Sequence, residues 1–202
     1  MKKFITLALA LCMALSASIC ASAAEVNTDG GSGSTPVYLS STEDGTLEGE
    51  PSATAMSVTV PTALPMAMSQ TGDVTTADNC KIINNSYGAV RVKSVNITTA
   101  NGWRLTSFGD KSTLASEKVD SNKLGFALSI GGGTQVMTDT SDESSQMLIS
   151  SPIAGCYMSG IGNASGNAVS VDYEAIVTPL SNAVTNANIA NVVFVIEWDT
   201  AA

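Results

Sequence analysis

Residues 88–99 read GAVRVKSVNITT, and their pattern decides the fold. Four apolar side chains share one face of an extended strand if the alternation skips one position midway: Val90, Val92, Val95 and Ile97. Arg91 and Lys93 fall on the opposite face. A β-bulge at Ser94 would produce the skip, because a bulge adds one residue to one strand of a pair. The stretch therefore predicts a bulged strand with one apolar face.

Similar runs of β-branched and aromatic residues, separated by turn residues, recur along the chain. They occupy residues 56–60, 81–83, 103–105, 124–130, 146–149, 169–178 and 191–198. The last run, NVVFVIEW, is apolar on both faces and predicts a central strand. Only residues 180–190 are expected to hold a short turn of helix. We predict an all-β fold, an antiparallel β-sandwich of jelly-roll or Ig-like type, over residues 56–200.

The first 23 residues have the features of a secretory signal peptide. Lys2 and Lys3 precede an apolar run from Phe4 to Leu15, and Ala21-Ser22-Ala23 supplies the small residues of a cleavage site. The apolar run is shorter than the ~20 residues that cross a bilayer. We therefore expect residues 1–23 to be removed and the mature chain to be secreted, with no membrane association.

Residues 24–55 are rich in Gly, Ser, Thr and acidic residues, which predicts a disordered arm. Within this arm, Val37, Tyr38 and Leu39 have high strand propensity. Two explanations stay open. The three residues pair with an open sheet edge of another copy, or they fold back on their own domain or stay loose.

The charge balance excludes some partners. Without the signal peptide the chain has 7 basic and 18 acidic residues, a net charge of −11. Such a surface repels nucleic acid and anionic membranes. The arm carries a charge of −6, whereas residues 81–123 hold seven basic and three acidic residues, a local charge of +4. These opposite signs predict that charge steers the arm onto a neighbouring copy.

The chain contains no histidine, which excludes histidine-based triads and metal sites. Cys80 and Cys156 are the cysteines that remain after signal removal. In an oxidising compartment they are candidates for one disulfide. The alternative is two buried, unpaired thiols that act as small apolar side chains.

The remaining candidates for chemistry are carboxylates. Asp139, Asp142 and Glu143 form the densest acidic group and are candidate calcium ligands, with a solvated acidic loop as the alternative. Asp172 and Glu174 lie on the same face of one strand and do not form a glycosidase pair, whose carboxylates face each other across a cleft. We predict no catalytic residue, no cofactor and no enzymatic activity.

Exposed aromatic side chains often serve as platforms for sugars. Tyr87 and Tyr157 lie next to predicted turns and are the candidates for such platforms. Trp103 and Trp198 are expected to pack inside the sandwich. The candidate partners are therefore glycans of a cell wall or of host glycoproteins, besides a second copy of the chain.

Four segments resemble those of secreted β-sandwich proteins of Gram-positive bacteria: VTVPTALP (58–65), IINNS (82–86), NGW (101–103) and VVFVIEW (192–198). The pattern looks like that of the WxL-domain surface proteins and of the TasA/camelysin-type matrix-fibre proteins. A WxL protein would show Trp-x-Leu, whereas Trp198-Asp199 is followed here by Thr200. The camelysin-type resemblance implies a jelly-roll subunit that forms fibres by strand exchange.

Two functions follow as expectations. The first is a structural or adhesive protein of the bacterial cell surface or extracellular matrix, which assembles through its N-terminal arm. The second is a tethered module that binds a carbohydrate or a host glycoprotein without catalysis.

Overall fold

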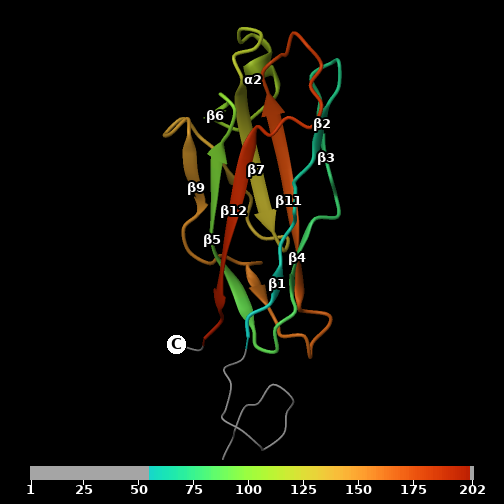
Figure 1. The fold of residues 1–202 in the computed structure, drawn as a ribbon. Helices are drawn as coiled ribbons and strands as arrows, with labels where there is room; N and C mark the ends of the chain where they lie inside the picture. The colour runs from blue at the N-terminus through green and yellow to red at the C-terminus, as the bar shows by residue number, and fades with distance from the viewer. Residues whose placement is uncertain (1–54, 201–202) are drawn as a thin grey trace, which may run out of the picture. The chain divides into compact units, whose positions relative to one another are not determined.

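The computed structural model describes residues 55–200 (Figure 1). The signal peptide expected at 1–23 lies outside the described residues. So does the arm expected over 24–55, except for Ala55, and with it Val37, Tyr38 and Leu39.

The described residues form an all-β sandwich, as predicted. One sheet has the strand order β1 (Val58–Thr59), β4 (Lys81–Asn84), β11 (Ala168–Val177), β7 (Lys123–Ile130), β6 (Arg104–Thr106), with β8 (Val136–Met137) also paired to β7. The other has the order β10 (Tyr157–Met158), β5 (Val90–Thr99), β12 (Ala190–Trp198), with β9 (Ser145–Ile149) also paired to β5. A hairpin joins β2 (Met66–Met68) to β3 (Val74–Thr76). All pairs are antiparallel except β6 with β7.

The core lies between the two sheets. The four apolar residues of 88–99 are fully buried: Val90, Val92, Val95 and Ile97. They form one buried cluster with side chains from β7 and β11, which include Leu124, Phe126, Leu128, Val171 and Tyr173. Burial of one face of each sheet is the main stabilising term of such a fold.

The predicted bulge is present in β5. On the partner strand Val195 lies opposite Ser94 and the next residue, Ile196, lies opposite Val92, so Lys93 has no partner on β12. The extra residue returns the later apolar side chains to the buried face. The bulge therefore involves Lys93 and Ser94, and the prediction from the sequence is confirmed.

The prediction that residues 191–198 form a central strand is wrong. β12 pairs with β5 alone, so it is an edge strand. Its outward side chains Val193 and Val195 are 52% and 42% exposed. The apolar residues on both faces of the strand suggested a position inside a sheet, with a neighbouring strand at each edge. Among residues 55–200, however, no strand pairs with the second edge of β12.

The helix expected over 180–190 is also absent, because residues 180–189 are irregular. Several asparagines interrupt this segment, and asparagine favours turns over helix. The helical turn α2 (Ser112–Ala115), not predicted, is the one helix among residues 55–200. None of the described helices is long and apolar enough to cross a membrane.

One outward-facing side chain of β11, that of Ile176, is buried, and the segment that leads to α2 explains why. Ile176 points to the outer face of its sheet and yet is only 8% exposed. It packs over Gly125, where an added Cβ would lie 2.7 Å from the Ile176 side chain and 2.9 Å from the Ser107 carbonyl oxygen. The segment that leads to α2 therefore covers part of the outer face of the sheet.

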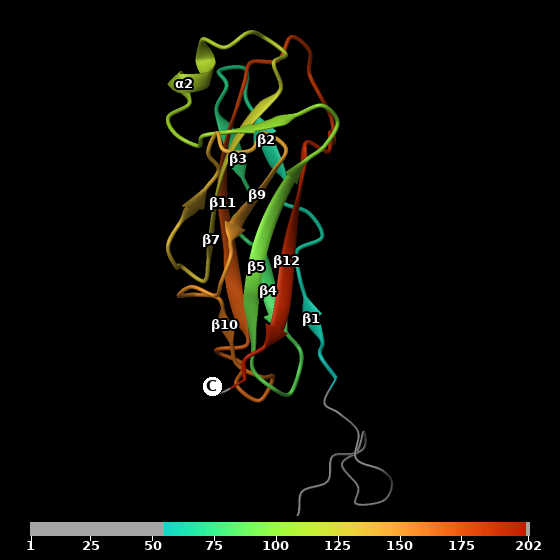
Figure 2. The ribbon, with the colours of Figure 1, turned by 90° about the vertical axis from the view of Figure 1, so that its left-hand side faces the viewer.

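The sandwich has two distinct ends. At one end lie α2, the β2–β3 hairpin and the irregular segment 180–189, and β1 begins at the other (Figure 1). The view turned by 90° shows the same arrangement (Figure 2).

Candidate functional site

An apolar groove of about 790 Å³ opens at the end that carries the β2–β3 hairpin. It lies where β5 and β11 end and β7 and β12 begin. Its apolar lining comes from both sheets, from the hairpin and from the segment 180–189, and includes Leu64, Met66, Ile97, Phe126, Val177 and Val192. Its volume falls within the range of about 300–1,000 Å³ that ligand sites occupy.

Tyr173 of β11 fixes the hairpin that forms one wall of the groove. Its hydroxyl donates a hydrogen bond to the carbonyl oxygen of Pro65, just before β2. The same hydroxyl accepts one from the backbone N–H of Ala77, just after β3, at 3.2 Å. The ring is buried, and burial raises the pKa of Tyr173. One core side chain thus holds both ends of the hairpin.

Hydrogen bonds fix the segment 180–189 at the rim of the groove. Asn101 Nδ2 donates to the carbonyl oxygen of Asn188 at 2.8 Å. Asn101 has φ 52° and the following Gly102 has φ 78°, both in the left-handed region that Asn-Gly turns favour. At the other end of the segment, Ser181 donates two bonds to the Asp120 carboxylate, and these bonds lower the pKa of Asp120.

The free edge of β12 begins beside the groove. The carbonyl oxygen of Ile189 accepts a hydrogen bond from the N–H of Ala100, and the N–H of Asp199 donates one to the carbonyl oxygen of Ala89. Because the backbone groups of a strand point to alternate edges, odd-numbered residues of β12 direct theirs to β5. Even-numbered residues direct theirs to the free edge: Val192, Phe194 and Ile196.

Within residues 55–200, this edge lacks the usual protection. Proteins guard exposed edges with charged residues, proline or short strands. Residues 190–196, ANVVFVI, contain neither a charge nor a proline, and β12 has nine residues. The next longest described strand with one neighbour, β9, has five. Groove and edge together can accept an extended segment, whose backbone would pair with β12 while alternate apolar side chains enter the groove.

The local positive charge expected to steer the arm is largely neutralised by ion pairs. Acidic residues from outside 81–123 pair with four of the seven basic residues: Arg91, Lys93, Arg104 and Lys111. Lys123 pairs with Glu117, one of the three acids inside this range. In particular, Glu197 of β12 lies 2.8 Å from Arg91 and 3.1 Å from Lys93. The steering hypothesis rested on the net charge of residues 81–123 alone. In the folded domain, acidic residues from outside this range lie beside these basic side chains.

The calcium candidates do not converge on one point. Asp139 Oδ1 accepts a bond from the Ser141 N–H, and Asp142 Oδ1 accepts bonds from Ser144 and Ser145. These bonds lower the pKa of both aspartates. Glu143 faces Arg104 instead, at 3.7 Å. Among residues 55–200 no group of three or more carboxylate or thiol side chains is placed to hold a metal ion.

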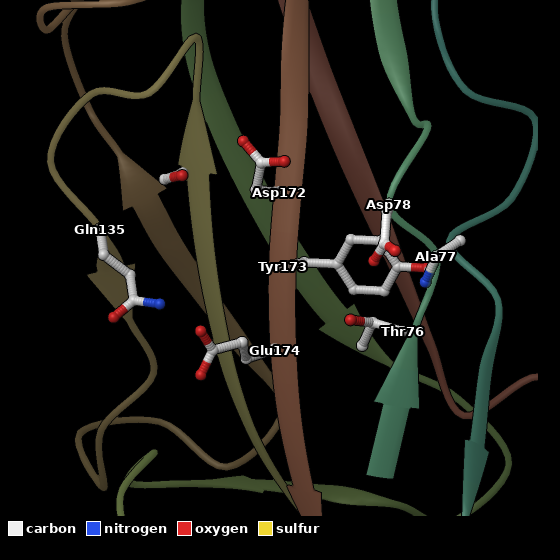
Figure 3. A pocket seen from close by; sticks show the side chains of 8 residues that line it. Thr76, Ala77, Asp78, Gln135, Asp172, Tyr173 and Glu174 are labelled. Carbon is white, nitrogen blue, oxygen red and sulfur yellow. The ribbon is translucent and has the colours of Figure 1, made fainter.

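Asp172 and Glu174 lie beside a small polar hollow of about 250 Å³ on the outer face of β11. Figure 3 shows both carboxylates on the side of β11 opposite the Tyr173 ring. Both side chains are exposed on one strand, as the sequence predicts, and they do not face each other across a cleft.

Cys80 and Cys156 are both free in the structure. Cys156 is fully buried in the core cluster, where burial raises its thiol pKa, and Cys80 is half-buried before β4. The two thiols are unpaired in the structure, and only Cys156 has the burial of the alternative, in which both thiols are buried.

The aromatic candidates lie where the sequence indicates. Tyr87 is 84% exposed and Tyr157 is 48% exposed. Trp103 and Trp198 are half-buried against the core, and Trp103 also lines the groove.

The sequence reasoning missed the groove, because its lining comes from distant segments whose contacts depend on the complete fold. It also missed the short strands β2, β3, β8 and β10, which have two or three residues each. One signal was available. The uncharged run 190–196 is unusual for an exposed strand.

The fold and the site define a class: an all-β sandwich with an apolar groove beside an unguarded edge strand. Comparison with known proteins finds no matching family model, no matching curated protein and no matching solved structure.

Proposed function

We propose that this chain is a secreted structural subunit of a bacterial cell surface or extracellular matrix. In this proposal, the N-terminal arm of one copy enters the groove of another and pairs with its β12. The observation that carries the proposal is the unguarded edge of β12 beside an apolar groove.

The arm has the residues that such a site would select. Val37 and Leu39 are two positions apart, so in a strand both side chains would point into the groove while Tyr38 points outward. The groove lining contains no charged residue, and residues 34–41, STPVYLSS, contain none. Apolar contacts and backbone hydrogen bonds would therefore supply the affinity, rather than charge.

The arm is long enough for this role. Residues 40–54 lie between Leu39 and the first described residue, and 15 extended residues reach up to about 50 Å. The ten residues of β5 span roughly 33 Å. The arm can therefore reach a groove on a neighbouring copy or the groove of its own domain, and the state of association distinguishes the two.

Deletion of residues 24–54 tests the proposal. We expect the chain from residue 24 onward to form oligomers or fibres in light scattering and negative-stain microscopy. The chain without the arm should be a folded monomer, and a peptide of residues 34–41 should bind it saturably.

A matched pair of variants separates the apolar contacts from charge. V37D/L39D should prevent assembly, whereas S40D/S41D, which adds the same charge beside the apolar residues, should retain it. Unchanged assembly after arm deletion would contradict the proposal. A monomer whose arm protects its own β12 in hydrogen exchange would show that the arm folds back instead.

A second candidate function is glycan binding, and the exposure of Tyr87 and Tyr157 favours it. It predicts saturable binding to a polysaccharide or a host glycoprotein that Tyr87→Ala or Tyr157→Ala weakens. A glycan array without binding would argue against it.

A further inference from the structure

Two loops meet at the end of the sandwich opposite the groove. We call this end the tip and define it by residues 84–89 and 159–167. Its two large apolar side chains are unusually accessible, since Tyr87 is 84% and Ile161 is 52% exposed. A single exposed apolar residue is ordinary, but two on adjoining loops at one end of a domain suggest a contact surface.

The tip is held rigidly. The side chain of Asn84, which is fully buried, donates from Nδ2 to the carbonyl oxygens of Gly88 and Ser159, both at 2.8 Å. The N–H of Ile161 donates to the carbonyl oxygen of Ser86 at 2.9 Å. The loops approach so closely that a Cβ added at Gly160 would lie 1.9 Å from the Tyr87 carbonyl oxygen. A surface that is already ordered loses little entropy when it binds.

The first described residues of the chain contact the tip. The carbonyl oxygen of Ser57 accepts hydrogen bonds from the Asn85 N–H and the Ser86 hydroxyl, at 2.8 and 3.1 Å. The N–H of Ser57 donates to the Ser86 hydroxyl at 2.8 Å. Ser57, two residues after the first described residue, therefore lies at the tip, whereas the groove opens at the other end.

The end that holds the groove has its own pair of exposed apolar residues. Val119 is 47% and Val184 is 58% exposed. The loops that carry them are joined by the two bonds from Ser181 to Asp120, at 2.9 and 2.6 Å. We call this surface the opposite pole and define it by Val119 and Val184.

We propose that the tip of one copy seats on the opposite pole of the next copy, so that Tyr87 and Ile161 contact Val119 and Val184. This contact rests on the proposed function, because an arm that leaves the tip of one copy and enters the groove of another brings these two surfaces together. The contact joins different surfaces of identical subunits, which produces a ring or an open filament rather than an isologous dimer. Once the arm is bound, it raises the effective concentration of the tip at the opposite pole, so a weak contact between them is enough for assembly.

Site-directed cross-linking tests the contact with the full mature chain. Asn85→Cys places a thiol beside Tyr87, and Thr185→Cys places one beside Val184, and both positions are exposed. We expect mild oxidation of a mixture of the two variants to give a mixed dimer, with tags of different size to identify it. Cross-linking of Asn85→Cys with itself would mean tip-to-tip contact and would overturn the proposal, as would the absence of any mixed dimer.

Substitution measures the strength of the contact. Because truncation of a central apolar contact commonly weakens binding about tenfold or more, Y87A/I161S should raise the concentration needed for assembly by about that factor. Val119→Ser should also raise it, and Val184 is left unchanged because it lines the groove. Met137→Ser is the control, since Met137 is 52% exposed on β8, away from both ends, and should leave assembly unchanged.

The outcomes separate this contact from the arm. If arm deletion abolishes assembly while Y87A/I161S assembles like the unmodified chain, the tip contact is wrong and the proposed function stands. If the unmodified chain is monomeric at every concentration, both are wrong. If Tyr87→Ala abolishes binding to a neutral polysaccharide and leaves assembly unchanged, the tip serves a glycan instead.

Discussion

At the scale of single residues, Tyr173 connects the core to the candidate site. Its ring packs against Phe126, with ring centroids 6.0 Å apart, and its hydroxyl reaches the backbone on both sides of the β2–β3 hairpin. Buried tyrosine hydroxyl groups usually have a partner, because an unpaired one loses its hydrogen bonds to water. The wall of the groove therefore depends on one phenolic oxygen.

Tyr173→Phe should reduce the free energy of unfolding by about 1–2 kcal/mol, because it leaves the carbonyl oxygen of Pro65 and the N–H of Ala77 without this partner. Urea unfolding would show the loss as a lower midpoint with an unchanged slope. Tyr157→Phe, at a half-exposed position, should change the stability by less than about 0.5 kcal/mol. Equal effects of the two substitutions would contradict the role of Tyr173.

At the scale of elements, β12 carries the functional argument. Its inward side chains pack on the core, its outward valines are exposed, and its second edge has no partner among residues 55–200. The sequence predicted the strand and its apolar character correctly. It did not predict the position of the strand at an edge, because the position depends on which strands lie beside it.

The double substitution V193K/V195K should prevent assembly and leave the folded domain intact. Both residues are exposed, so lysine is tolerated there, and charges on an edge strand oppose pairing with another strand. Light scattering measures assembly and circular dichroism checks the fold. Met147→Lys is the matched control, because Met147 is 59% exposed on the shorter edge strand β9. Loss of assembly in the control, or its retention in the double variant, would count against β12 as the acceptor.

At the scale of the whole molecule, the charged groups determine the response to pH. Histidine is the only side chain with an unperturbed pKa between 5 and 8, and the chain has none. In the folded domain, serine donors lower the pKa of Asp120, Asp139 and Asp142, and Arg91 and Lys93 lower that of Glu197. A carboxylate with a lowered folded pKa stabilises the fold above its unfolded pKa, and the stabilisation is lost as the pH falls through the folded value.

The thermal unfolding midpoint should therefore be nearly constant from pH 8 to pH 5 and should fall below about pH 4, where the unfolded carboxyl groups begin to bind protons. Differential scanning calorimetry across this range tests the prediction. Asp142→Asn, which removes one titrating group, should make the acid-side decline shallower. A decline between pH 7 and pH 5 would show that another group controls stability.

The sequence by itself determined the longer strands, the buried face of residues 88–99, the bulge and the exposure of Tyr87, since alternation and turn chemistry act between neighbours in the chain. The tertiary structure decided which strands became edges, where the groove opened and which acids neutralised Arg91 and Lys93. These features join residues far apart in the chain. Their physical cause is the packing of two sheets, and no local pattern encodes the order of strands in a sheet.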